Sequence, residues 1–187
     1  MKTVIILNGK PRSGKDTAIK MMQDLLMVAK VPVEWFSSID PVRDMLTNAK
    51  FDLSQKTQAD RDLMAEVGDA VEKHSGYRSK MCVFKVLDFF EAHPDSAVMF
   101  LHVREKLVID RVKQMLAGWP TGPYAVTTIF LNSPHGIDVT SNAADRDVHL
   151  VDYDHQIDNT GSLDDLARAC DRMLVKLGLI DQLSLLH

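Results

Sequence analysis

The chain has 187 residues, of which 45% are hydrophobic and 26% are charged, as in folded globular proteins and unlike disordered ones. At about 150 residues per domain, this length predicts a single domain. The 22 lysines and arginines against 26 acidic residues give a net charge of −4, which excludes the broad positive field that binding a nucleic-acid polymer requires. Small phosphorylated ligands are not excluded, because a local cluster of basic groups is enough to bind them.

The apolar runs and the cysteines indicate the cellular compartment in which the protein is expected. No run approaches the ~18 apolar residues of a membrane span, and the first run ends at Asn8, too early for a signal peptide. Cys82 and Cys170 form no CxxC pair, so we expect neither a disulfide framework nor a zinc site. We therefore expect a cytoplasmic protein that does not associate with membranes.

Short apolar runs alternate along the chain with longer segments in which apolar residues recur every three or four positions. The short runs predict buried strands, and the periodic segments predict helices. In chain order we expect a strand over 4–7, a helix over 15–30, a strand over 33–36, a helix from 40, a helix from 57 to 76, a helix over 81–90, a strand over 97–101, a helix over 107–116, a strand over 126–131, a polar irregular stretch over 132–147, a strand over 154–157 and a helix from 162 to 177.

Side chains with a capping oxygen mark the starts of three of these helices. Asp40 precedes a proline, which predicts an N-cap followed by proline in the first turn. Thr57 with Asp60, and Ser162 with Asp165, have the spacing of a capping box, in which each side chain bonds the other residue's backbone N–H.

The alternation of strands and helices predicts the fold class. It indicates a three-layer α/β domain with a parallel sheet of about five strands and helices on both faces. In such sheets ligands bind at the carboxyl ends of the strands. The residues that follow each strand are therefore the first candidates for function.

The first strand is followed by a glycine-rich loop that ends in lysine. Its sequence, Gly9-Lys10-Pro11-Arg12-Ser13-Gly14-Lys15-Asp16-Thr17, matches the pattern G-x-x-x-x-G-K, with aspartate where Ser or Thr is usual. Glycines let backbone N–H groups surround a phosphate, and the lysine reaches the β- and γ-phosphates at the N-terminus of the next helix. The pattern predicts that ATP is bound by Gly9, Arg12, Ser13, Gly14, Lys15, Asp16 and Thr17.

The loop Gly-x-x-x-Ser-Gly-Lys-Asp-Thr resembles that of phage-type deoxynucleoside monophosphate kinases and animal phosphomevalonate kinases, in the adenylate-kinase-like branch of the P-loop proteins. Three further segments are similar to those kinases: Val103-Arg104-Glu105 after the third strand, 153–163 around the closing strand, and Arg61-Asp62-Leu63-Met64 with Gly68 on the acceptor-side helix. The resemblance implies a P-loop NTPase domain over residues 1–187 that uses ATP and Mg²⁺.

Two positions differ from the usual magnesium site. Asp16 stands where most phosphate loops have a metal-binding hydroxyl, as it does in the resembled kinases, so Asp16 or Thr17 is expected to take that role. His102 stands where the third strand of those kinases ends in aspartate. Because histidine is a poor ligand for Mg²⁺, another carboxylate must hold the waters of the metal. The candidates are Asp16, Asp40 and Glu105, of which we favour the first two.

Phosphoryl transfer depends on positioning and on neutralising the charge of the moving group. We expect Lys15 to neutralise the transferred phosphoryl and Asp40 to orient the acceptor or hold the metal. Arg104 would offset charge at the acceptor, and Arg146 would do so from a lid-like segment near 132–147. The acceptor-binding candidates are Ser37, Ser38, Arg43, Arg61 and Arg104.

The sequence therefore predicts an ATP- and Mg²⁺-dependent kinase that phosphorylates a small phosphorylated acceptor, with a (deoxy)nucleoside monophosphate as the first choice. Two alternatives remain open at this point. One is a kinase for another phosphorylated metabolite. The other is a nucleotide-binding regulatory module without catalysis, which the missing aspartate at His102 favours.

Overall fold

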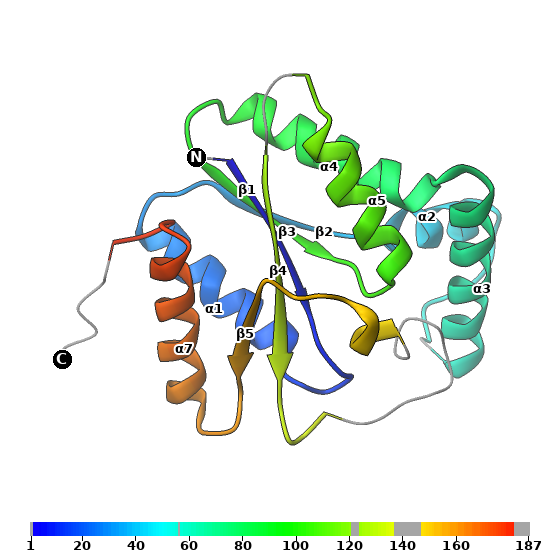
Figure 1. Ribbon diagram of the computed structural model, residues 1–187. Helices are drawn as coiled ribbons and strands as arrows, with labels where there is room; N and C mark the ends of the chain where they lie inside the picture. The colour runs from blue at the N-terminus through cyan, green and yellow to red at the C-terminus, as the bar shows by residue number, and fades with distance from the viewer. Residues whose placement is uncertain (1, 56, 121–123, 137–146, 182–187) are drawn as a thin grey trace.

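The computed structural model describes residues 2–55, 57–120, 124–136 and 147–181. Within them, five strands form one sheet in which all neighbours are parallel, in the order β2-β3-β1-β4-β5 (Figure 1). The strands are β1 (Lys2–Asn8), β2 (Val33–Ser37), β3 (Ala97–His102), β4 (Ala125–Asn132) and β5 (His155–Asp158). Each predicted strand is present within two residues of its expected bounds, and the predicted fold class is confirmed.

Strand β1 lies at the centre of the sheet and pairs with β3 on one side and β4 on the other. Ile5, for example, is opposite Phe100 of β3 and Thr127 of β4. Helices cover both faces of a parallel sheet, so its central strands bury the side chains of both faces. This explains why the run from 4 to 7 is continuously apolar rather than alternating.

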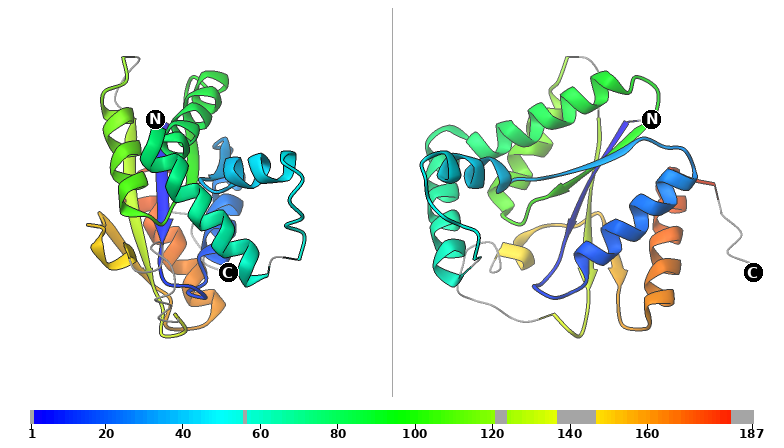
Figure 2. Two further views of the ribbon diagram at one scale, coloured as in Figure 1. Left: turned by 90° about the vertical axis from the view of Figure 1, so that its right-hand side faces the viewer. Right: turned by 180° about the vertical axis from the view of Figure 1, so that it is seen from behind.

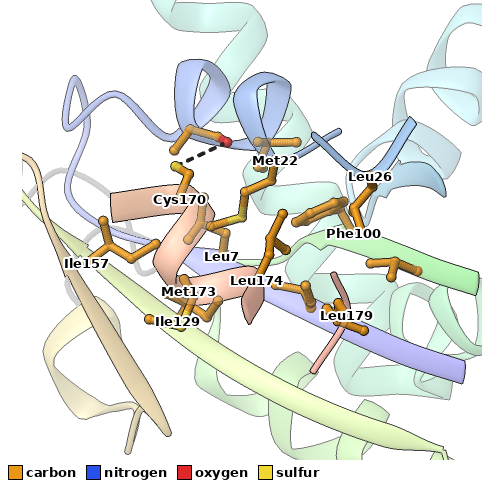
Figure 3. Packing of buried hydrophobic residues seen from close by; sticks show 14 of the residues in the cluster. Leu7, Met22, Leu26, Phe100, Ile129, Ile157, Cys170, Met173, Leu174 and Leu179 are labelled. Carbon is orange, nitrogen blue, oxygen red and sulfur yellow. Dashed lines mark hydrogen bonds between the residues drawn. The ribbon is translucent and has the colours of Figure 1, made fainter. Parts of the chain in front are cut away.

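Four helices cover the two faces of the sheet. Helices α1 (Lys15–Val28) and α7 (Leu163–Lys176) lie on one face, and α4 (Tyr77–Ala92) and α5 (Lys106–Ala117) lie on the other (Figures 1 and 2). Figure 3 shows the core on the first face, where Phe100 of β3 packs with Met22 of α1 and Leu174 of α7. Ile5 and Leu7 of β1 join this core, and Val4 and Ile6 join the core under α4 and α5.

Two further helices stand at the side of the sheet. Helix α2 (Asp40–Asn48) follows β2, and α3 (Gln58–Ser75) packs against α2 and α4. Figure 1 shows both on the side opposite α1 and α7. A single turn, η1 (Asp147–Leu150), precedes β5. Among the described residues, no helix has the length and apolar composition needed to cross a membrane.

Both predicted capping boxes are present, but two predictions about helix starts are wrong. Helix α4 begins at Tyr77 and not near 81, because Arg78 and Ser79 are buried through polar contacts that no apolar period reveals. Asp40 is the first helical residue of α2 rather than its N-cap, which is Ile39, and its carboxylate pairs with Arg43 instead of a backbone N–H.

Candidate active site

The predicted functional residues gather where the parallel strands end. Neighbouring strands run in the same direction, so their carboxyl ends lie along one edge of the sheet. At this edge β1 leads into the glycine loop, β2 into residues 37–40, and β3 into residues 103–105. Figure 1 shows the turn between β1 and α1 at the lower end of the sheet, where the arrowheads of β4 and β5 also point.

The loop after β1 is a compact turn closed by its own backbone. Gly14 adopts a left-handed conformation, with φ +91°, as the N-cap of α1. The Lys15 ammonium donates hydrogen bonds to the carbonyl oxygens of Gly9 and Lys10, at 2.8 and 2.7 Å. The lysine is thus folded over the loop, where the oxygens of a phosphate would replace these carbonyls as its acceptors.

Gly9 occupies a place where no side chain fits. A Cβ atom there would lie 2.6 Å from the carbonyl oxygen of Leu131 and 2.9 Å from the hydroxyl of Ser13. Ser13 is 1% exposed, and its Oγ has no hydrogen-bond partner among the described residues. Buried polar atoms without a partner are rare and costly. The loop therefore holds a hydroxyl that a polar ligand would satisfy.

The turn after β5 supports the loop. Asn159 donates a hydrogen bond from Nδ2 to the carbonyl oxygen of Ser13, at 2.9 Å. A Cβ atom on Gly14 would lie 2.8 Å from the same Nδ2, so glycine is needed there for the two segments to approach. This contact places the segment 153–163, singled out by its resemblance to a kinase family, directly against the phosphate loop.

Asn8 connects the loop to the neighbouring strands, a role that the sequence did not indicate. It is fully buried, accepts a hydrogen bond from the Gly9 N–H at 2.8 Å, and donates one to the carbonyl oxygen of Arg104 at 3.2 Å. The hydroxyl of Tyr153 shares a hydrogen bond with the same amide. The side chain thereby fixes the start of the loop relative to the end of β3.

Arg78 is the second important residue that sequence reasoning missed. Although charged, it is only 2% exposed, and it reaches from α4 to the ends of β2 and β3. Its guanidinium donates to the carbonyl oxygen of Ser38 at 3.3 Å and to its hydroxyl at 2.9 Å, and forms an ion pair with Glu105 at 2.7 Å. A second ion pair joins it to Asp69 at 3.7 Å.

Gly68 lies beside this arginine. A Cβ atom on Gly68 would lie at ordinary contact distances of 3.4 Å from Cδ of Arg78 and 3.5 Å from its Nη1, and at a tighter 3.3 Å from Cδ1 of Ile39. The glycine was singled out on the acceptor-side helix only by resemblance. The structure places it where α3 packs against the side chain of Arg78.

Glu105, a predicted candidate for the magnesium shell, faces a cation. Its carboxylate is held by Arg78 at 2.7 Å, with the side chain 16% exposed. The arginine that neutralises this charge is buried, whereas the partner of Asp40 is exposed, so Glu105 is a weaker candidate than the other two carboxylates. Its observed contact is structural, because it ties the end of β3 to α4.

His102 lies between several charged groups at the end of β3. Its ring contacts that of Trp35 on β2, with centroids 5.4 Å apart, and its Nε2 is buried with no partner among the described residues. Burial lowers its pKa from the usual 6.5, with Arg104 and Lys15 acting in the same direction and Asp16 and Asp40 opposing it. These four charges come from the loop and from the ends of β2 and β3, so His102 marks the place where those segments meet.

The β2 side of the site holds three of the predicted acceptor residues. Ser38 is buried and donates its N–H to the carbonyl oxygen of His102 at 3.1 Å, while Ser37 is half-buried opposite His102 in the strand register. Arg43 forms an ion pair with Asp40 at the start of α2. The predicted acceptor residues of β2 and α2 are thus adjacent to one another and to β3.

The remaining predicted arginines are placed differently. Arg104 is exposed directly after β3, and its charge acts on His102. Arg12 is exposed in the loop with φ +62°. Arg61 is exposed in the first turn of α3, with no side-chain contact to the loop or to β3 among the described residues. Arg146 and most of the predicted lid fall outside the described residues.

The carboxylates of the site fit a magnesium ion that is held mainly by water and phosphate. Among the described residues, no three acidic, histidine or cysteine side chains form a group that would hold a metal alone. Mg²⁺ bound with a nucleotide needs only one or two carboxylates besides phosphate and water. Asp16 and Asp40 both act to raise the pKa of His102, so both carboxylates lie in the neighbourhood of that ring. The exposed hydroxyl residue Thr17 is next to Asp16.

Comparisons with known proteins support the fold. A scan against models of known protein families gives no match, and no curated protein matches the chain. Among solved structures, a cysteine variant of the Mycobacterium tuberculosis APS kinase superposes with a TM-score of 0.52 at 12% identity, covering 93% of this chain and 97% of that one. The same kinase in complex with AMPPNP and APS gives a TM-score of 0.51 at 12% identity, with 93% and 98% covered.

These superpositions extend over nearly the whole of both chains, so the fold is shared from end to end. At 12% identity the likeness concerns the fold alone. The chain therefore has a three-layer α/β fold like that of these two structures, and its activity has to be argued from its own residues.

The packing around Gly9 predicts the effect of adding one methyl group. Gly9→Ala places a Cβ atom against a backbone carbonyl that cannot move without disturbing β4, so we expect a loss of roughly 1–3 kcal/mol in the free energy of unfolding. Gly118→Ala is the control, because a Cβ there meets its nearest neighbour at an ordinary 3.6 Å. Urea unfolding measures both, and equal stabilities of the two variants would contradict the close packing.

The buried His102 predicts a dependence of stability on pH. Its pKa is lower in the folded protein than in the unfolded chain. Below about pH 6.5 the unfolded chain therefore binds the proton more readily, so the free energy of unfolding decreases as the pH is lowered. His102→Asn removes this group, so the variant should lose less stability than the wild type between about pH 7.5 and 5.5. Urea unfolding at both pH values measures the difference. An unchanged pH dependence would show that His102 is not held neutral by the fold.

Proposed function

We propose that the protein transfers the γ-phosphoryl group of ATP to a small phosphorylated acceptor, with a (deoxy)nucleoside monophosphate as the first choice. The observation that carries this proposal is the link through Asn8 between a closed glycine-lysine loop and the arginine after β3. A phosphate-binding loop and a cation for a second anion are thereby held at one sheet edge. This is the arrangement that transfer between two phosphorylated molecules requires.

The donor side consists of the loop and the start of α1. Backbone N–H groups of the loop and the positive end of the helix attract the phosphates of ATP. Lys15 already lies over the loop on two carbonyl oxygens, and phosphate oxygens offer it stronger, charged acceptors in the same region. The buried hydroxyl of Ser13 is an additional polar group inside the loop.

Mg²⁺ would be held at this side by Asp16, Thr17 and Asp40 together with its waters. The ion would supply positive charge that neutralises part of the charge of the phosphates. Asp40 is already paired with Arg43, at 27% exposure of the carboxylate side chain, so water can reach it. The chain's own residues thus provide oxygen ligands on both sides of His102.

The acceptor side consists of residues at the ends of β2 and β3. Arg104 is suited to bind the acceptor phosphate, because a guanidinium donates two parallel hydrogen bonds to such a group. Ser37 and Ser38 lie beside His102 on the neighbouring strand, and Arg43 pairs with Asp40 at the start of α2. Arg78 is a positioning residue here, since it holds Ser38 by a hydrogen bond and Glu105 by an ion pair from its place on α4. Arg61 and Arg146 stay predicted contributors from α3 and the lid.

The transfer itself needs no covalent intermediate with the protein. An oxygen of the acceptor phosphate attacks the γ-phosphorus, while the bond to the bridging oxygen breaks and ADP leaves with the electron pair. Lys15 stabilises the charge of the moving group from the loop, and Arg104 reduces the repulsion between the two phosphates. The solved kinase with the same fold was bound to AMPPNP and APS, which supports a two-substrate site without identifying this acceptor.

The regulatory-module alternative is favoured by one observation, the neutral histidine in place of a third-strand carboxylate. A thermal-stability scan separates the two functions. A nucleotide analogue with Mg²⁺ is added first, followed by each (deoxy)nucleoside monophosphate and other phosphorylated metabolites. A ligand at 100 times its dissociation constant adds about 2.7 kcal/mol of stability. Stabilisation by the nucleotide alone, with no acceptor and no transfer, would favour the module.

Lys15 provides the first test of the donor side. Lys15→Ala removes a charge at the start of a helix without opening a core cavity, so we expect the fold to remain and phosphoryl transfer to fall by roughly 100-fold or more. Lys20→Ala, which changes an exposed lysine of the same helix, is the matched control. Transfer of labelled γ-phosphate measures both. Near wild-type turnover in Lys15→Ala would show that ATP does not use this loop.

Arg104 provides the test of the acceptor side. Arg104→Ala should raise the KM for the acceptor roughly tenfold or more, the effect of losing one charge-assisted contact, and leave the affinity for ATP nearly unchanged. Arg172→Ala, an exposed arginine on α7, is the matched control. Steady-state kinetics and nucleotide binding provide the two values. If ATP binding were lost while the acceptor still bound, the two sides of the proposed site would be exchanged.

A further inference from the structure

A hollow in the surface lies away from the glycine loop that follows β1. It has a volume of about 570 Å³ and lies between the end of α3, the start of α4 and the middle of α5. In Figure 1 the connection from α3 to α4 is at the upper right, whereas the turn between β1 and α1 is at the lower end of the sheet. The volume lies within the range of roughly 300–1,000 Å³ that small-molecule sites occupy.

Basic side chains from three helices line this hollow. Lys73 comes from α3, Lys80 from α4 and Arg111 from α5. None of the described residues that line it is acidic, and neither lysine forms an ion pair within the described part of the chain. Like charges that face one space repel each other, and an anion between them removes that repulsion.

Two of these cations converge on Gly76. A Cβ atom on Gly76 would lie 3.7 Å from Nη1 of Arg111 and 4.0 Å from Cε of Lys80, so both side chains reach the backbone turn that begins α4. Gly76 adopts φ +65°, which glycine tolerates without strain. The side chains of Arg111 and Lys80 therefore meet over a turn that carries no side chain of its own.

The side chain of Arg111 is held in place by the buried Glu72. Its Nη1 donates to the carboxylate and to the carbonyl oxygen of Glu72, both at 2.7 Å. Glu72 is 2% exposed and also accepts hydrogen bonds from the N–H and hydroxyl of Ser79. Burial alone would raise the pKa of Glu72, but the bonds from Ser79 and Arg111 outweigh it, so the pKa is lowered and the group stays ionised. Arg111 is thereby fixed on one side while 36% of its side chain remains exposed.

We infer that this hollow is a binding site for the phosphate group of a small metabolite, separate from the phosphate loop. Two lysines from different helices provide the charge, the guanidinium that Glu72 holds in place provides further hydrogen-bond donors, and Ser75 and Gln114 provide neutral hydrogen-bonding groups at its wall. The first turn of α4, which carries Lys80, also carries Arg78, and Arg78 fixes the ends of β2 and β3. The inference does not rest on the proposed kinase activity.

The experiment follows backbone amide signals by NMR while pyrophosphate is added to the full chain at constant ionic strength. We expect the signals of Gly76 and Lys80 to shift in a saturable way, and to do so equally in Lys15→Ala, in which the phosphate loop is impaired. The double variant Lys73→Ala/Lys80→Ala should weaken this binding roughly tenfold, the effect of two partly solvated ion pairs. Lys20→Ala/Lys176→Ala, which removes the same charge from α1 and α7, should leave it unchanged.

A second titration with AMP identifies the source of the phosphate group. Tighter binding of AMP than of pyrophosphate indicates an organic phosphate as the ligand, and equal or weaker binding indicates free inorganic phosphate; either result supports the site. Shifts confined to Gly9 and Gly14 would overturn the inference. So would equal binding by the two double variants.

Discussion

The hydrogen bonds of the Asn8 side chain are the constraint on which the geometry of the site depends. This amide is fully buried between the end of β1 and the end of β3. It orients Gly9 through the backbone N–H and holds the residue that carries the Arg104 side chain through its carbonyl oxygen. A buried amide left without partners is costly, so these bonds resist rearrangement. The distance between the glycine loop and the backbone of Arg104 is therefore set at the ends of β1 and β3 and not by flexible surface side chains.

The buried charge of Arg78 imposes a similar constraint on the other side of β3. A guanidinium at 2% exposure is tolerated only where ion pairs and hydrogen bonds replace water. Here Glu105 and Ser38 satisfy that need, and both lie at strand ends that face the site. The same pairing neutralises the charge of Glu105. The electrostatic requirement of one helix residue thus fixes the carboxylate that follows β3.

The strands, the parallel sheet and the glycine turn after β1 could be predicted from the sequence because their signals are local. A continuous apolar run or a glycine-lysine pattern carries its own physical reason, whatever lies around it. Arg78 and Asn8 could not be found in this way, because their partners are 40 and 96 residues distant along the chain. Asp40 illustrates the same limit, since an arginine one helical turn later competes with the cap that its position suggested. Residues that act through tertiary partners are visible only once the sheet has brought those partners together.

We expect Lys15 to change its hydrogen-bond partners when nucleotide binds. In the structure its ammonium donates to the carbonyl oxygens of Gly9 and Lys10, at 2.8 and 2.7 Å. The most direct test is a crystal structure of the protein with Mg²⁺ and a non-hydrolysable ATP analogue. We expect the phosphates to lie in the loop, with the ammonium on their oxygens and the metal near Asp16 and Asp40. An analogue bound elsewhere, with Lys15 still on both carbonyls, would contradict the assignment of the loop as the donor site.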